Sequence, residues 1–260
     1  MELRNWKKYK DDLKLTTDGL WLSNFGRYSG AFILPKRDSS EIFVPPKRDI
    51  FCDFDSSFHG LFIPEIPYQF IIRFAKDSGW IWDCFAGSGT THYVANKLGC
   101  VNRCIVNDIE ATKSYIIEAD SKEFNPLKYS NNEKIRLLFF HPPYFDIVKF
   151  TDKDQDLSLC ENLDKFLVEI NKVVKNVVQY VSGFVILICG NIYYKGEEID
   201  LGVIVKEMFR SCGLKCKSHI IKDYGETKAK GSGYSLQYYR NLKNNTNFFY
   251  GDNIFILQSI

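Results

Sequence analysis

Two short segments hold the residues whose types and spacing point most clearly to chemistry. The first, at 80–91, reads WIWDCFAGSGTT, an apolar run followed by an acid and then by small residues. Small residues let the backbone approach a ligand closely, and a helix that begins after them offers unpaired N–H groups. Its acid, Asp83, suits a cationic group better than a phosphate. Because neither GxxxxGK[ST] nor GxGxxG is present, the segment favours a nucleoside pocket over a P-loop.

The second segment, FFHPPYFD at 139–146, could act on an amino group. Pro142 and Pro143 stiffen the chain, remove two N–H donors and leave carbonyls able to face a site. The Pro142 carbonyl and the His141 side chain could accept the hydrogens of an aromatic amine and turn its lone pair toward an electrophilic methyl group. Tyr144 could stack on a flipped base, which returns about 1–3 kcal/mol of the cost of flipping. Alone, PPY also fits a rigid loop with a core aromatic.

Two further carboxylates follow apolar runs. Asp108 ends the run at 103–107 and could accept both hydroxyls of a ribose, or it could cap a helix. Asp120, in EADSKEF, could accept from an adenine amino group, or it could be an acid of a turn.

The elements that must position these residues alternate between strand and helix. We expect helices at 66–75, 91–98, 163–181 and 203–212, from their apolar periodicity. We expect strands at 80–84, 103–107, 115–119, 135–140, 184–189, 214–221 and 253–258. The gap between the second and third strands is too short for an ordinary crossover helix. This order predicts a mostly parallel sheet with helices on both faces, with ligands at the carboxyl ends of its strands.

The motifs resemble those of the DNA amino-methyltransferases, which methylate adenine N6 or cytosine N4 using S-adenosyl-L-methionine. DxFAGSGTT resembles their cofactor motif, HPPY resembles their [DNS]PP[YFW] catalytic motif, and Phe58–Ile71 resembles the segment that packs over the methionine end of the cofactor. The resemblance covers 58–260. It implies a class I methyltransferase (Rossmann-like) fold with a mostly parallel, seven-stranded sheet.

The resemblance also implies the site residues. It places Asp83 near the methionine moiety, Asp108 on the ribose and Asp120 near the adenine. The implied catalytic residues are His141, Pro142, Pro143 and Tyr144. The implied cofactor-binding residues are Phe58, His59, Phe62, Ile63, Pro64, Asp83, Phe85, Ala86, Gly87, Ser88, Gly89, Thr90, Thr91, Asp108, Ile109, Asp120 and Ser121.

One position departs from the family pattern. His141 stands where adenine enzymes usually carry Asp or Asn and cytosine-N4 enzymes usually carry Ser. A neutral imidazole can accept one hydrogen bond and a protonated one cannot, so we expect activity to fall at acidic pH. The choice between adenine N6 and cytosine N4 stays open.

We expect three regions in the chain: an N-terminal extension at 1–57 with possible DNA contacts, a catalytic domain at 58–260, and a DNA-contacting insertion at 222–251 within it. Lys222–Gly251 is basic and aromatic, which suits nucleic acid, although a long hairpin that packs its rings on the core is the alternative. Phe145–Cys160 should be a mobile loop after the catalytic motif. The expected DNA-binding residues are Lys149, Lys153, Lys228, Lys230 and Arg240, and Lys222 and Lys243 add to the basic stretch.

Composition sets outer limits on function. With 260 residues, 45% hydrophobic and 25% charged, the chain suits one large α/β domain, and its net charge of +2 neither requires nor excludes nucleic acid. Its apolar runs are too short to cross a bilayer, and its charged N-terminus does not resemble an export signal. We therefore expect a cytoplasmic protein whose eight cysteines are reduced; without a CxxC pair, no metal site is expected.

Together these features predict a site-specific DNA methyltransferase that binds a short duplex site, with a cognate restriction endonuclease as a candidate partner. Two alternatives stay open. One is an RNA base N-methyltransferase, since guanosine-N2 enzymes of tRNA carry a similar PPY motif. The other is an inactive homologue that only binds DNA.

Overall fold

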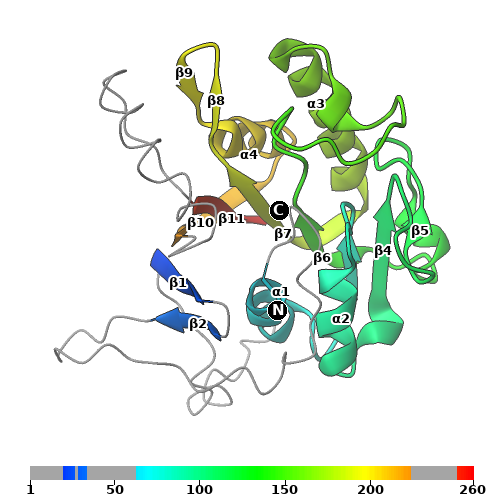
Figure 1. The fold of residues 1–260 in the computed structure, drawn as a ribbon. Coiled ribbons are helices and arrows are strands. Elements are labelled where there is room, and N and C mark those ends of the chain that lie inside the picture. Colours follow the sequence, from blue (N-terminus) through cyan, green and yellow to red (C-terminus); the bar gives the residue numbers. More distant parts are fainter. Residues whose placement is uncertain (1–19, 27–28, 34–62, 224–250) are drawn as a thin grey trace, which may run out of the picture.

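The computed structural model describes residues 20–26, 29–33, 63–223 and 251–260. In this part of the chain a sheet of nine strands runs through the molecule in the order β2-β1-β10-β11-β7-β6-β3-β4-β5 (Figure 1). Its central strands are β3 (Trp80–Asp83), β4 (Cys104–Asp108), β6 (Ile135–Phe140) and β7 (Val181–Gly190), all parallel to their neighbours within this group. The short β5 (Ile117–Glu118) adds a parallel edge.

The other side of the sheet is mixed, with β1 parallel to β10 and the remaining pairs antiparallel. β11 (Gly251–Gln258) pairs antiparallel with both β7 and β10 (Lys215–Asp223). Two strands of the expected N-terminal extension, β1 (Leu20–Gly26) and β2 (Ser29–Ile33), continue the sheet beyond β10. The predicted seven strands are therefore present, and two more join them; the predicted boundary at 57/58 stays a prediction.

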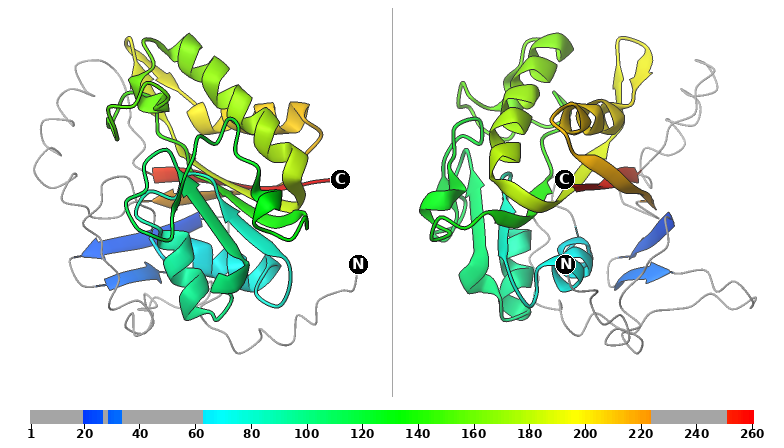
Figure 2. Two further views of the ribbon diagram at one scale, coloured as in Figure 1. Left: turned by 90° about the vertical axis from the view of Figure 1, so that its right-hand side faces the viewer. Right: turned by 180° about the vertical axis from the view of Figure 1, so that it is seen from behind.

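Helices cover both faces of the sheet, as predicted (Figure 2). On one face lie α1 (Glu65–Phe74) and α2 (Thr90–Lys97), and on the other lie α3 (Leu163–Val177) and α4 (Leu201–Ser211). The central strands are apolar on both sides because alternate side chains point to opposite faces. In β6, Leu137 and Phe139 pack toward α1 and α2, whereas Leu138 and Phe140 pack toward α3 and α4.

The amphipathic patterns of the two longer helices explain which side they bury. In α3 the buried residues recur at helical spacing, and Asn162 caps its first turn by accepting a hydrogen bond from the Lys165 N–H at 2.9 Å. The predicted helix at 163–181 ends earlier than expected. A 3-10 turn, Val178–Tyr180, follows α3 and leads directly into β7.

One connection between strands was predicted correctly, and another feature was not predicted. No crossover helix separates β4 from β5, as predicted. A small hairpin between β7 and α4 was not predicted: β8 (Ile192–Tyr194) and β9 (Glu197–Ile199) project from the end of the sheet (Figure 1). Lys195 and Gly196 both have positive φ, 51° and 88°, which is the backbone of a two-residue hairpin turn. In the part of the chain that the structure describes, no helix has the length and apolar character needed to cross a membrane.

Candidate active site

The two motifs meet at β3 and β6, where the order in which the chain adds strands to the sheet reverses. From β3 the chain moves outward to β4 and β5, and it then returns to place β6 on the other side of β3. Ligands of open α/β sheets bind at the carboxyl ends of the strands beside such a reversal. A cavity of about 170 Å³ lies there. Of the predicted site residues, it is lined by Phe85, Gly87, Asp108, Ile109, Asp120, Ser121, His141, Pro142, Pro143 and Tyr144.

Asp83 fixes the loop after β3 from beneath. Its side chain is fully buried, and its two carboxylate oxygens accept from the Phe85 N–H at 3.1 Å and from the Thr91 hydroxyl at 2.5 Å. Burial raises the pKa of Asp83 to about 7, against both hydrogen bonds, which lower it. Asp83 does not line the cavity, so in this structure it holds the loop against α2. Its direct contact with a cofactor stays a prediction.

The glycines of the loop are required by its geometry. Gly87 and Gly89 have positive φ, 51° and 86°, a region that costs other residues free energy. A Cβ at Gly89 would also lie 2.5 Å from the Tyr115 hydroxyl. Ala86, Thr90 and Thr91 are buried and support the turn without lining the cavity.

Asp108 lies at the carboxyl end of β4 with its carboxylate on the cavity. It accepts from the Gly87 N–H at 2.8 Å and from the Glu110 N–H at 3.3 Å, which ties β4 to the loop after β3. Burial raises the pKa of Asp108 above its ordinary value, although these backbone donors lower it. The second lone pairs of its oxygens remain suited to hydroxyl donors such as those of a ribose.

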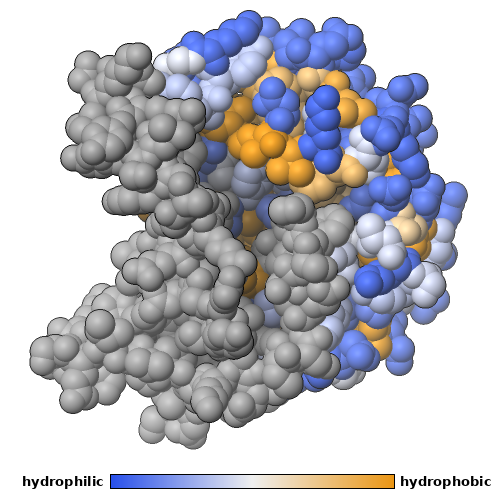
Figure 3. All heavy atoms as spheres, viewed as in Figure 1, coloured by the Kyte–Doolittle hydropathy of each residue, from blue (hydrophilic) through white to orange (hydrophobic). Residues whose placement is uncertain are grey.

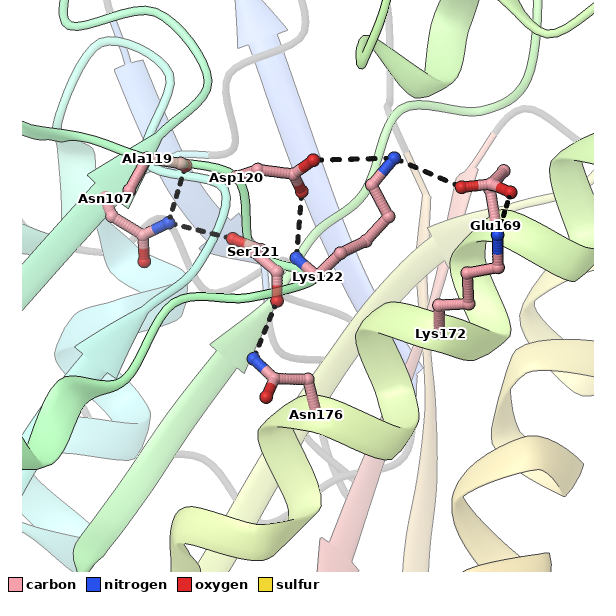
Figure 4. Close-up of polar contacts among 8 residues, drawn as sticks. All are labelled: Asn107, Ala119, Asp120, Ser121, Lys122, Glu169, Lys172 and Asn176. Carbon is pink, nitrogen blue, oxygen red and sulfur yellow. Dashed lines mark hydrogen bonds and ion pairs between the residues drawn. The ribbon is translucent and has the colours of Figure 1, made fainter.

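Asp120 and Ser121 lie beyond β5 in a polar network (Figure 4). Asp120 accepts from the Lys122 N–H at 2.8 Å and is 3.4 Å from its ammonium group, which also binds Glu169 at 3.1 Å. The Ser121 hydroxyl donates to the Cys84 carbonyl at 2.5 Å and accepts from the Asn107 amide at 2.8 Å. The network fixes the floor of the cavity.

Sequence reasoning did not find Asn107, which organises this network. It is fully buried in β4, accepts from the Trp82 indole N–H at 2.7 Å and donates to the Ala119 carbonyl at 3.2 Å. An asparagine inside an otherwise apolar strand was the available signal, because buried amides need partners.

One hydroxyl in the loop tests whether a nucleoside with an amino-acid tail fits the site. The Ser88 Oγ atom is buried and has no hydrogen-bond partner among the described residues. Buried polar atoms in native proteins are nearly always paired, so this atom suits a polar ligand group. With the Asp108 carboxylate at the end of β4, where it accepts from the Gly87 N–H of this loop, the residues present fit S-adenosyl-L-methionine.

The catalytic motif follows β6 and forms a chain of polar contacts. His141 Nε2 is 3.0 Å from the Tyr144 hydroxyl, which donates to Asp252 at 2.8 Å. Asp252 in β11 is 3.5 Å from the ammonium group of Lys222 in β10, and both side chains are almost fully buried. Burial lowers the pKa of His141 to about 4, although Asp252 raises it, so the imidazole is neutral at neutral pH.

The position of Lys222 corrects one expectation. Its side chain is only 2% exposed, so it does not belong to a basic surface that contacts DNA. Asp252 was missed, because no local pattern in the sequence links it to a tyrosine 108 residues away.

The loop after the motif closes one side of the cavity with Ile147, Val148, Phe150 and Thr151. Phe145 starts it with φ 55°, a costly conformation for a non-glycine residue that is common at functional sites. Asp156 is buried and accepts four hydrogen bonds, from the N–H and hydroxyl groups of Thr151 and Ser158. These contacts give the loop a defined conformation; its predicted mobility is untested.

Of the two lysines expected to contact DNA in this loop, Lys149 is exposed. Lys153 instead binds Glu118 at 2.6 Å and the Ile109 carbonyl at 2.7 Å. Lys149 is therefore the better placed of the two for a phosphate.

The other predicted residues fall into two groups. Ile63 and Pro64 are buried at the start of α1 and do not line the cavity. Phe58, His59, Phe62, Lys228, Lys230, Lys243 and Arg240 lie outside the described residues. Among the described residues no group of three His, Cys, Asp or Glu side chains could hold a metal ion.

No family model and no curated protein matches the sequence. Among solved structures the chain is similar to TrmN from Thermus thermophilus, with a TM-score of 0.46 and 13% identity over 78% of this chain and 50% of that chain. A SAM-dependent methyltransferase from Archaeoglobus fulgidus gives 0.43 and 10% over 75% of this chain and 93% of that chain. The plantazolicin methyltransferase BpumL, solved in complex with SAH, gives 0.38 and 10% over 76% and 82%.

These likenesses concern the fold, and the chain spans only half the length of TrmN. The fold is identified by its topology. The strand order is β5-β4-β3-β6-β7-β11-β10, with β11 antiparallel to both of its neighbours, and this is the strand order of class I methyltransferases. The predicted fold class is confirmed.

Proposed function

We propose that this protein is an S-adenosyl-L-methionine-dependent methyltransferase that modifies an exocyclic amino group of a nucleic-acid base, with DNA as the substrate. The observation that carries the proposal is the cavity that joins the Asp108 carboxylate to His141 and Pro142. One wall of it can bind a nucleoside, and the other presents acceptors to an amine.

The cofactor would be held by residues of the first wall. The Asp108 carboxylate lines the cavity and suits the ribose hydroxyls. Ser88 lies on the loop beside this wall without lining the cavity, and its buried hydroxyl suits a polar group of the methionine tail. When bound, S-adenosyl-L-methionine would supply an electrophilic methyl group for transfer to the amine nitrogen, and the proton that the nitrogen gives up would pass to solvent.

The second wall would orient the target. A neutral His141 imidazole can accept one amino hydrogen, and the Pro142 carbonyl can accept the other. Holding both hydrogens aims the nitrogen lone pair away from them, toward the cofactor side of the cavity. Positioning of this kind accounts for much of the rate in such reactions.

Apolar surface near the cavity suits the body of a base. Ile147 and Phe150, on the loop that lines it, are 58% and 37% exposed. Figure 3 shows hydrophobic surface gathered in the region of α4 and the loop after β6, bordered by hydrophilic surface. A flipped base presents two apolar faces and gains free energy from such contacts.

The test supplies the protein with S-adenosyl-L-methionine carrying a labelled methyl group and with unmethylated DNA or unmodified tRNA. Digestion to nucleosides and mass spectrometry then identify the product. N6-methyladenine or N4-methylcytosine in DNA supports the proposal, and a methylated base in tRNA alone supports the RNA alternative. If the protein binds the cofactor but methylates neither DNA nor tRNA, the remaining alternative is an inactive homologue that only binds DNA.

His141→Ala is the matched variant. It removes the acceptor while the cofactor wall stays intact, so methyl transfer should fall with cofactor affinity unchanged. The inactive-homologue alternative instead predicts unchanged DNA binding and no activity to lose.

A further inference from the structure

Four side chains within and behind the catalytic motif come from three strand ends. His141 and Tyr144 follow β6, Asp252 lies in β11, and Lys222 lies in β10. The contacts run in sequence, from His141 Nε2 to the Tyr144 hydroxyl at 3.0 Å, on to Asp252 at 2.8 Å, and then to Lys222 at 3.5 Å. Only His141 and Tyr144 belong to the HPPY motif. Asp252 and Lys222 are distant in the sequence, and the fold brings them to it.

The number of protons on Tyr144 and Asp252 determines which ring nitrogen of His141 carries the hydrogen and which carries the lone pair. A tyrosine hydroxyl has one proton, and Tyr144 donates it to Asp252. An ionised carboxylate can only accept, so the proton between Tyr144 and His141 must come from the ring. Nε2 therefore carries the hydrogen, and in the neutral ring Nδ1 carries the lone pair.

Lys222 keeps the direction of these hydrogen bonds. A buried ammonium group needs a charged partner, and Asp252 supplies the negative charge beside Lys222. The two residues are 2% (Lys222) and 4% (Asp252) exposed. Asp252 thus remains an acceptor for Tyr144.

The Tyr144 ring is also fixed from the side. A Cβ added to Gly190, at the end of β7, would lie 2.9 Å from Tyr144 Cε2. The ring therefore packs directly on the backbone there, and this close approach places its hydroxyl between His141 and Asp252.

We propose that Asp252 and Lys222 are positioning residues which, through Tyr144, hold His141 as the Nε2–H tautomer, so that Nδ1 accepts the hydrogen bond from the target amino group. The second half of this statement rests on the proposed function, and the first half does not. Tyr144 then has a role that phenylalanine cannot fill, although phenylalanine would keep the aromatic ring.

The tautomer is measured directly by long-range 1H–15N spectra of protein labelled at its four histidines, at pH 7. Loss of one set of signals in His141→Gln assigns His141. We expect the Nε2–H pattern in the unmodified protein and loss of that preference in Tyr144→Phe. Tyr193→Phe, which removes a hydroxyl that binds only the hairpin carbonyl of Gly196, is the matched control and should leave the pattern unchanged.

A second variant covers the charged pair. Removing Asp252 alone would take a negative charge away from the buried Lys222 ammonium group, so Asp252→Leu is combined with Lys222→Met. This double variant should also lose the Nε2–H preference, because the Tyr144 hydroxyl becomes able to donate to His141. An Nδ1–H pattern in the unmodified protein, or an unchanged Nε2–H pattern in both Tyr144→Phe and the double variant, overturns the proposal.

Activity tests the second half separately. In Tyr144→Phe we expect kcat to fall about tenfold, because that is the effect on rate of losing one well-placed hydrogen bond. The KM for the cofactor should be unchanged. Unchanged kcat in a variant whose tautomer has shifted refutes the link to catalysis. If no substrate is methylated by any form of the protein, the proposed function fails while the tautomer assignment is still decided by the spectra.

Discussion

Asp83→Asn is a sensitive probe of the loop after β3, because this buried carboxyl stays protonated to unusually high pH. Its pKa is raised from an ordinary 3.8 to about 7, chiefly by burial. Asparagine has nearly the same shape and does not titrate in this range. It can still accept from the Phe85 N–H and can donate to the Thr91 hydroxyl, since a hydroxyl is also an acceptor.

The sign follows from proton binding. Between pH 3.8 and about 7 the folded protein holds a proton on Asp83 that the unfolded chain has lost. Stability therefore falls as the pH rises through this window, by about 1.4 kcal/mol per pH unit in its middle. Relative to the unmodified protein, Asp83→Asn should gain about 2.5 kcal/mol of unfolding free energy between pH 4.5 and pH 6.5.

Urea unfolding of both proteins, followed by tryptophan fluorescence at the two pH values, measures this gain. Other titrating groups contribute alike to both proteins and cancel in the difference. Asp146→Asn, at an exposed carboxyl, controls for the loss of one acid. If the difference between Asp83→Asn and the unmodified protein is the same at both pH values, Asp83 ionises in the fold as it does in the unfolded chain, and the argument from burial is refuted.

Three further outcomes test the site. Gly89→Ala should lower unfolding free energy by about 1–2 kcal/mol, since φ is 86° and the new Cβ would meet Tyr115; an unchanged melting temperature would contradict this. Asp108→Asn should weaken S-adenosyl-L-methionine binding about tenfold or more by calorimetry, because a charged acceptor is lost; equal affinities would exclude Asp108 as a ligand. Because burial holds the pKa of His141 at about 4, methyl transfer by Asp83→Asn, which lacks the carboxyl with a pKa of about 7, should show no acid limb near pH 6.5 and should fall only as the pH approaches 4; a limb near 6.5 in this variant would show an ordinary, exposed imidazole.

Local sequence was a good guide to elements that bury apolar side chains at a regular period. β3 and β6 are mostly apolar, and both ended close to where the pattern predicted. The hairpin of β8 and β9 was missed because its strands are only three residues each, too short to show a period, although Lys195-Gly196 is a recognisable turn.

The two motifs, and with them the fold class, could be predicted from sequence because each motif is a contiguous segment with its own backbone requirements. Gly87 and Gly89 need positive φ, and two prolines fix the chain after His141. Only the tertiary structure decided which residues stand behind them. Asp252 and Lys222 reach Tyr144 because antiparallel pairing aligns β10 and β11 beside β7. Strand register brings together residues far apart in the chain, and no local pattern carries that information.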